Sequence, residues 1–276
     1  MDNGCPICGE SSLAELSSLN LAYLRCGACA SLSLPPSASS PSQIGSDPPE
    51  VEKAKEAIYR SGLDLLETLS PRGPLLDVGA GNGGFLTAAR ERGWTPSGVE
   101  PDPAAAARAR SLGLEVFTGV LSDLPPGACY SAVTLWDSLD MLPDPLQGLV
   151  MVREALEPGG VVLARVRNPS AHLFLRRWLG GWASRLPSIS PTFHRYGLSA
   201  RGLRVLFERA GLETVSVANS KLTSGDPYAS RRGPGRNLVA AIKNAVAGAA
   251  AAAEAASGGS LLWGASLIAV ARRPKQ

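Results

Sequence analysis

Two cysteine pairs near the start of the chain have the spacing of metal ligands. Cys5 and Cys8 form one C-x-x-C pair, Cys26 and Cys29 form a second, and residues 9–25 separate them. Four thiolates at such spacing bind Zn²⁺ tetrahedrally and leave no coordination position open for catalysis. The spacing therefore predicts a structural zinc ribbon with four cysteine ligands, in which metal binding supplies folding free energy that so short a segment lacks.

A glycine-rich turn, LLDVGAGNGGF, has the residue types of a nucleotide-binding loop. Gly79, Gly81 and Gly84 satisfy G-x-G-x-x-G, and Glu100 follows about twenty residues later. This pattern fits a dinucleotide-binding turn, but a lone match is a weak signal. Asp77 favours another ligand, because a carboxylate at that strand end suits a positive ammonium group better than a pyrophosphate.

The composition limits the compartment and the partners that we expect. The chain has 276 residues, is 45% hydrophobic and carries a net charge of +3, which is too weak to indicate nucleic acid. No apolar run is long enough to span a membrane, and the first residues lack the features of a secretory signal. We therefore expect a cytoplasmic protein whose cysteine pairs bind metal rather than form disulfides.

Alternating strands and helices must position these residues. The alternation predicts an α/β fold with a doubly wound, mostly parallel seven-stranded sheet, in which one of the last two strands could insert antiparallel. The expected strands are 74–78, 96–100, 114–119, 131–137, 161–167, 212–218 and 260–273. The expected helices are 84–93, 102–113, 144–160 and 198–211, preceded by a helical pattern from Glu50 to Leu69 that Gly62 weakens.

Changes in composition divide the chain into domains. The zinc ribbon would span residues 1–32, and the Pro/Ser-rich residues 33–49 would form a linker. The large domain would span residues 50–276. Within it, residues 219–259 form an insertion before the last strand that is basic at first and then alanine-rich and helix-forming.

Five segments resemble, in the same order, those of the class I S-adenosylmethionine-dependent methyltransferases of the small-molecule subgroup. They are LLDVGAGNGGF, GVEPD, YSAVTLWDSLDMLPDP, REALEPGGVVLARVRNP and PTFHRYGLSARGLRVLFERAGLE. The resemblance covers residues 50–218 and 260–274 and implies a Rossmann-like domain that binds S-adenosyl-L-methionine. Similar zinc ribbons precede the methyltransferase domain in bacterial enzymes that modify sugars, lipids and other secondary metabolites, and in some that modify ribosomal RNA.

The resemblance also implies a role for each residue of a cofactor site. The loop with Asp77, Gly79, Ala80, Gly81 and Gly83 would pass under the methionine half, and Asp77 would act on its amine. Glu100 would accept hydrogen bonds from the ribose, Pro101 would pack on the adenine, and the backbone of Val120 and Leu121 would edge it. Trp136 and Asp137 would border the methyl group. For each there is a plainer interpretation, such as tight packing for the glycines or a core position for Trp136.

The chain lacks a histidine at the position where the resembling subgroup commonly has one, and this absence guides the choice of candidate catalytic residues. Methyl transfer from a sulfonium mainly needs alignment, and a base matters only when the acceptor's proton has a high pKa. The subgroup commonly has Glu-His after the fourth strand, where this chain has Asp140 and Met141. His194, Tyr196 and Asp137 are therefore the candidate catalytic residues, and Asp140 is a lesser one. His194 could equally cap a helix or lie in the core.

The acceptor is expected to be small and anionic. Between residues 162 and 212 there are nine arginines and a single acid, Glu208, and arginine matches phosphate geometry, although a solvated basic face is an equal alternative. Residues 172–186 place tryptophans and leucines on one helical face beside arginines. That segment is either a lid on its own domain or a contact with the inner face of the membrane.

A methyltransferase acting on a nucleotide-linked or lipid-linked sugar is the favoured function, and three alternatives stay open. An RNA methyltransferase would grip nucleic acid with the ribbon, but the ribbon's one basic residue is Arg25, so nucleic acid is not expected as a partner. The second alternative is a protein that binds the cofactor but has lost catalysis, which would explain why Met141 stands where a histidine is expected. A nicotinamide-dependent dehydrogenase would explain the glycine turn alone.

Overall fold

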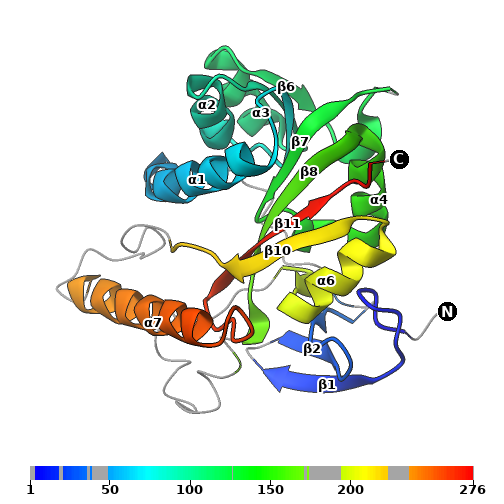
Figure 1. Cartoon of the computed structure of the whole chain (residues 1–276), viewed down its shortest axis with the longest axis vertical. Helices are drawn as coiled ribbons and strands as arrows, with labels where there is room; N and C mark the ends of the chain where they lie inside the picture. Colours follow the sequence, from blue (N-terminus) through cyan, green and yellow to red (C-terminus); the bar gives the residue numbers. More distant parts are fainter. Residues whose placement is uncertain are drawn as a thin grey trace.

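The computed structural model describes residues 4–18, 21–35, 38, 49–125, 127–170, 173, 194–222 and 236–275. Two sheets organise this part of the chain (Figure 1). The larger sheet has seven strands in the order β10-β11-β8-β7-β4-β5-β6, and the smaller has four in the order β1-β2-β3-β9.

The larger sheet confirms the predicted α/β fold. Its strands are β4 (Pro74–Val78), β5 (Thr95–Glu100), β6 (Glu115–Thr118), β7 (Tyr130–Trp136), β8 (Leu156–Arg167), β10 (Glu213–Asn219) and β11 (Ser266–Arg272). Strands β4 to β8 pair in parallel, whereas β11 lies antiparallel between β8 and β10. The last strand of the chain is therefore the one that inserts antiparallel.

Helices cover both faces of this sheet (Figure 1). One face carries α1 (Pro49–Leu69), α2 (Gly84–Glu91) and α3 (Pro103–Ser111), and the other carries α4 (Pro145–Ala155) and α6 (Ala200–Arg209). The short 3-10 turns η1 (Leu121–Asp123) and η2 (Leu139–Met141) follow β6 and β7, and α7 (Arg236–Ala256) contacts β10.

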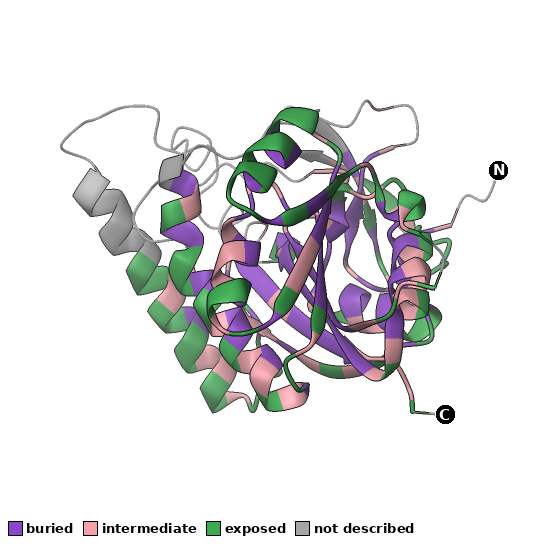
Figure 2. Ribbon diagram, turned by 90° about the horizontal axis from the view of Figure 1, so that it is seen from above, coloured by how far each residue is buried: buried purple, intermediate pink, exposed green. Residues whose placement is uncertain are grey.

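Neighbouring residues of one strand enter different cores. Leu75 packs with α1 and α2, whereas Leu76 packs on the side of α4 and α6, because successive side chains of a strand point to opposite faces. Figure 2 shows the consequence, with buried strands between helices whose outer surfaces are exposed. This two-sided burial explains why the strands are nearly continuous apolar runs in the sequence.

Gly62 does not interrupt α1 but makes room for an aromatic ring. A Cβ atom at this position would lie 2.4 Å from a ring carbon of Trp136. That indole packs against Tyr59 and Phe85, with ring centroids 5.2 Å and 5.1 Å away. Glycine costs a helix interior about 1 kcal/mol relative to alanine, and here the close approach of Trp136 requires it.

Two predicted boundaries were wrong. The helix expected within 144–160, before its Pro-Gly-Gly stop, already ends at residue 155, and β8 begins directly after it rather than at residue 161. Pro158 cannot donate a helical hydrogen bond, and Gly159 has a left-handed φ of 84°, so the chain cannot remain helical there. The last strand, expected over 260–273, begins only at Ser266.

The smaller sheet joins the cysteine-rich segment to the large domain. Its hairpin consists of β1 (Leu13–Ser18) and β2 (Leu21–Cys26), and β3 (Leu32–Ser33) pairs with β2. The fourth strand, β9 (Tyr196–Gly197), comes from the large domain and pairs antiparallel with β3. The ribbon therefore shares a sheet with residues more than 160 positions away in the sequence.

Helix α6 provides a second attachment for the ribbon. Ser199 is its N-cap: its Oγ accepts a hydrogen bond from the Gly202 amide at 2.9 Å and donates one to the Cys29 carbonyl. At the other end of the helix, Arg209 donates to the Ile7 carbonyl at 2.7 Å. Ile7 is fully buried in the same core as Phe207.

We expect Ser199→Ala to be more destabilising than the loss of an ordinary helix cap. It removes a cap, worth about 1 kcal/mol, and also leaves the buried Cys29 carbonyl without this donor, for a total of about 2 kcal/mol. Asp102→Ala is the matched control, because Asp102 caps α3 by accepting from the Ala104 amide and has no ribbon contact among its hydrogen bonds. Urea denaturation measures both losses, and equal losses would show that this ribbon contact contributes nothing.

Candidate functional site

The glycine turn is fastened to the end of β5. Gly79, Gly81 and Gly83 have φ angles of 81°, 54° and 84°, which favour glycine strongly. The Gly79 amide donates to the Val99 carbonyl at 2.8 Å, and the Gly81 amide donates to Glu100 Oε2 at 2.7 Å. The turn therefore has a defined shape before any ligand binds.

Glu100 connects this turn to the helix that follows β5. Its second oxygen, Oε1, accepts a hydrogen bond from the Asp102 amide at 2.9 Å, and the residue is only 8% exposed. A carboxylate oxygen can accept more than one hydrogen bond. Both oxygens are thus held in position and can still accept from a ligand's hydroxyl groups.

Asp77 is a buried carboxylate behind the turn. It is 2% exposed and accepts a hydrogen bond from Thr134 Oγ1 at 2.7 Å. Its pKa is raised to about 7, mainly by burial and also by the charges of Glu52 and Glu100, against the opposing effects of Thr134 and Lys55. This carboxyl group lacks enough positive charge nearby, and a cationic ligand would supply it.

Glu52 completes a negatively charged cradle of Glu52, Asp77 and Glu100 around the turn. A Cβ atom added to Gly84 would lie 2.2 Å from Glu52 Oε2, and Tyr59 donates a hydrogen bond to the same oxygen at 3.2 Å. This acidic cradle suits a sulfonium or ammonium group and repels a pyrophosphate. The sequence pattern of α1 showed only an amphipathic helix, so Glu52 and Lys55 were missed.

The end of β7 carries an ion pair. Arg165 contacts both oxygens of Asp137, at 2.5 Å and 2.6 Å, and Lys55 lies 3.8 Å away. Burial would raise the pKa of Asp137, but the charges of Arg165, Lys55 and Arg167 outweigh it and lower the pKa below its usual range. These contacts favour a positioning role for Asp137 over proton transfer. The Trp136 ring lies in the aromatic core, which favours its plainer interpretation as a packing residue.

The residues predicted to border the adenine differ in their exposure. Pro101 is exposed at the start of the segment after β5, Val120 is 50% exposed, and Leu121 is buried. The Val120 amide donates to Asp123 Oδ2 at 2.9 Å. The sequence prediction included only Val120 and Leu121 of this loop, so the acid three positions after Val120, Asp123, was missed.

His194 and Tyr196 come together with the ribbon. The Tyr196 hydroxyl donates to the Pro143 carbonyl at 2.9 Å, which attaches β9 to the loop after η2. The His194 carbonyl accepts a hydrogen bond from the Tyr23 hydroxyl of β2 at 3.3 Å. Residues 172–186, where a lid or membrane contact was predicted, lie outside the described residues except for Leu173.

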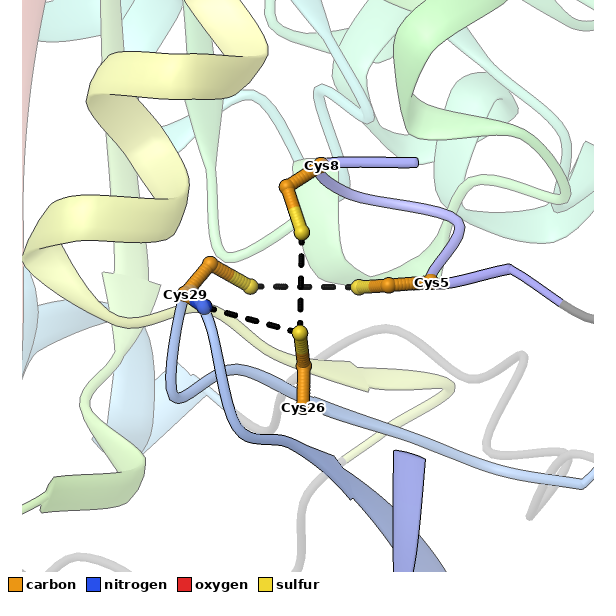
Figure 3. Close-up of side chains that lie close together, drawn as sticks. All are labelled: Cys5, Cys8, Cys26 and Cys29. Carbon is orange, nitrogen blue, oxygen red and sulfur yellow. Dashed lines mark hydrogen bonds between the residues drawn. The ribbon is translucent and has the colours of Figure 1, made fainter. Parts of the chain in front are cut away.

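The four ribbon cysteines form one cluster, as their spacing predicted. All four Sγ atoms lie within 4.8 Å of one another, and Figure 3 shows them pointing toward a common centre. The Cys5 and Cys29 sulfurs are 3.8 Å apart, and those of Cys8 and Cys26 are 3.5 Å apart. Tetrahedral Zn–S bonds of about 2.3 Å place sulfurs about 3.8 Å apart, so the cluster fits Zn²⁺.

A profile of the family described as "Methyltransferase domain" matches residues 51–217, which contain the glycine turn, the acidic cradle and the ion pair. The chain belongs to this methyltransferase family. The match ends before β11 and excludes the ribbon. A comparison with curated proteins finds no match.

Solved structures share the fold of this methyltransferase at low sequence identity. Magnesium protoporphyrin IX methyltransferase from Synechocystis, with bound S-adenosylhomocysteine, is 13% identical over 81% of this chain and 85% of its own, with a TM-score of 0.54. A SAM-dependent methyltransferase from Archaeoglobus fulgidus is 14% identical over 80% and 94%, with a TM-score of 0.53. The cyclase SpnF is 21% identical over 81% and 82%, with a TM-score of 0.51. One of these neighbours is named as a cyclase and another as a methyltransferase of magnesium protoporphyrin IX, so the shared fold does not identify the acceptor.

Within the described part of the methyltransferase, no helix has the length and apolar character to cross a membrane.

The charge on Asp77 should make the stability of the methyltransferase depend on pH. Its pKa rises from 3.8 to about 7 on folding, so the folded state holds the proton more tightly. The resulting stability is present below pH 3.8 and is lost as the pH rises through 7, by up to about 4 kcal/mol. Urea titrations should show Asp77→Asn gaining stability relative to the wild type between pH 4 and 8. A constant difference would contradict the raised pKa.

The ribbon should hold one zinc ion per chain. Inductively coupled plasma and native mass spectrometry of the purified protein would measure it, and Cys8→Ser with Cys26→Ser should abolish binding because two of the four ligands are removed. Cys129→Ser is the control, since Cys129 is exposed and lies outside the cluster. If the wild-type protein contains no zinc after growth in zinc-containing medium, the assignment of a zinc site is wrong.

Proposed function

We propose that this protein transfers a methyl group from S-adenosylmethionine to a small, anionic acceptor such as a nucleotide-linked or lipid-linked sugar. The observation that carries the proposal is the cradle of Glu52, Asp77 and Glu100 around a turn with left-handed glycines. When bound, the cofactor would supply a methyl group that is already activated on a positive sulfur, and an acidic cradle stabilises that charge.

Each cofactor contact has a structural argument. Asp77 would bind the methionine amine, and the turn of Gly79, Ala80, Gly81 and Gly83, whose Gly79 and Gly81 are partly exposed, would pass under the methionine half. Glu100, held by two backbone amides, would accept from the ribose hydroxyls. Pro101, Val120 and Leu121 would border the adenine, and Asp123 in the same loop could accept from its amine.

One arginine of the basic stretch between residues 162 and 212 supports an anionic acceptor. Arg165 is neutralised by Asp137, and Arg209 binds the ribbon. Arg195 differs from these, because its Nε is buried and has no hydrogen-bond partner among the described residues. A buried guanidinium nitrogen without a partner suits an anionic group of a substrate.

In this proposal the acceptor approaches from the side where the loop after β7, β9 and the ribbon meet. His194 and Tyr196 lie there, and Tyr196 holds the loop through the Pro143 carbonyl. These residues would align the acceptor in line with the methyl group and exclude water, which is the main requirement of this chemistry. RNA methylation and a silent cofactor-binding protein stay as alternatives, and the experiment below separates them.

Labelled methyl transfer tests the proposal. The purified protein and S-adenosyl-[methyl-³H]methionine are incubated with a cell lysate, which is then separated into lipid, carbohydrate, nucleotide and RNA fractions. We expect label in the lipid, carbohydrate or nucleotide fraction. Label in RNA would support the nucleic-acid alternative, and no label despite binding of S-adenosylhomocysteine would support the silent one.

Arg195→Gln should separate acceptor binding from cofactor binding. We expect about tenfold less labelling with the affinity for S-adenosylhomocysteine unchanged, since a charged hydrogen bond contributes about 1.5 to 3 kcal/mol. Arg201→Gln is the control, because Arg201 is an exposed arginine on α6. Equal labelling by the two variants would show that Arg195 does not bind the acceptor.

A further inference from the structure

A buried carboxylate in the loop after β7 has no hydrogen-bond partner on another described residue. Asp140 lies in η2, directly after β7, and its exposed fraction is 0%. Neither of its side-chain oxygens makes a hydrogen bond to another residue in the part of the chain that the structure covers, and its own backbone amide is the one donor that acts on it. Burying such a group without a partner is costly, so its retention calls for an explanation.

The charged and polar groups that face Asp140 come from distant segments. The charges of Arg167 on β8 and of Asp137 at the end of β7 act on it, with a weaker effect of Arg165. On the ribbon side, the charge of Asp140 acts on the Tyr23 phenol, which is 2% exposed. Strand β9, with Tyr196, also packs against η2. Asp140 therefore lies where the large domain and the ribbon meet.

These neighbours leave Asp140 able to exchange a proton near neutral pH. Burial raises its pKa to about 7, Arg167 opposes the rise, and Asp137 adds to it. Burial also raises the pKa of Tyr23 to about 12, so the phenol stays protonated. By contrast, the ion pair with Arg165 lowers the pKa of Asp137 and removes that residue from the same task.

We propose that Asp140 is the group that takes the acceptor's proton, that Arg167 positions and tunes it, and that Tyr23 forms the ribbon side of the acceptor site. The inference rests on the proposed function. The acceptor's oxygen or nitrogen forms a bond to the methyl carbon, and the carbon–sulfur bond breaks with its electron pair going to sulfur. The acceptor's proton passes to the Asp140 carboxylate, which afterwards releases it to water.

This assignment also gives the ribbon a role beyond stability. Tyr23 lies on β2, the strand that ends in Cys26, and its hydroxyl bonds the His194 carbonyl. The metal cluster and the pairing of β3 with β9 would therefore set the position of Tyr23 beside Asp140. The glycine turn, which follows β4, does not take part in positioning Tyr23.

The first test needs no acceptor. Infrared difference spectra of the wild type between pH 5 and 9 should contain a protonated-carboxyl band that titrates near pH 7 and disappears in Asp140→Asn. Arg167→Gln should move its midpoint to higher pH, because the removed positive charge favoured the carboxylate. Asp77→Asn identifies the separate band of Asp77. Spectra of the wild type and Asp140→Asn that are identical in this region would overturn the proposal.

The second test uses initial rates of tritium transfer into whichever lysate fraction the wild type labels. Asp140→Asn should lower the rate at saturating acceptor at least about 100-fold and abolish its rise with pH through about 7, with unchanged affinity for S-adenosylhomocysteine. Arg167→Gln should shift that rise to higher pH, and Tyr23→Phe should raise KM more than it lowers kcat. Asp64→Asn, on the exposed side of α1, is the control.

The outcomes distinguish this inference from the function on which it rests. A wild type that labels nothing rejects the proposed function, whereas labelling that survives in a folded Asp140→Asn rejects only the role of Asp140. If Asp140→Asn does not fold, the pH profile of Arg167→Gln decides, and an unshifted profile counts against the proposal.

Discussion

The hydrogen bond from the Gly81 amide to the Glu100 carboxylate is the contact on which the candidate cofactor site depends. It connects the turn after β4 to the end of β5, and the second oxygen of Glu100 holds the backbone that starts α3. Left-handed glycines form the turn, and they leave room for the side chains of Glu52, Ser138 and Leu114 to lie against it. The price of this arrangement is three carboxylates close together, and a cationic ligand would relieve their repulsion.

A positively charged neighbour explains why the two acids in the loop after β7, Asp137 and Asp140, differ in their pKa. Asp137 has Arg165 against both of its oxygens and therefore stays ionised. Asp140, three residues later, is more deeply buried and lacks such a partner in the described region, so its proton is held to higher pH. Two carboxyl groups of one short loop thus acquire distinct properties from their neighbours alone.

The ribbon is part of the large domain's architecture rather than a separate module tethered to it. Its third strand pairs with β9, its cysteine loop receives hydrogen bonds from both ends of α6, and Ile7 enters the main core. About thirty residues cannot bury enough apolar surface to fold alone. Docking on α6 therefore contributes to the ribbon's stability, and the pairing of β3 with β2 and β9 fixes where β2 lies relative to the large domain.

The sequence by itself determined the order of the elements, the family and the clustering of the four cysteines. Local signals carry these features: the caps Asp102 and Ser199, the apolar strands, the glycine turn and the cysteine spacing act over a few residues. Only the tertiary structure decided that Glu52 faces the glycine turn, that Gly62 accommodates Trp136, and that Asp137 is paired while Asp140 is not. Those facts depend on contacts between residues far apart in the chain, and such contacts leave no periodic pattern in the sequence.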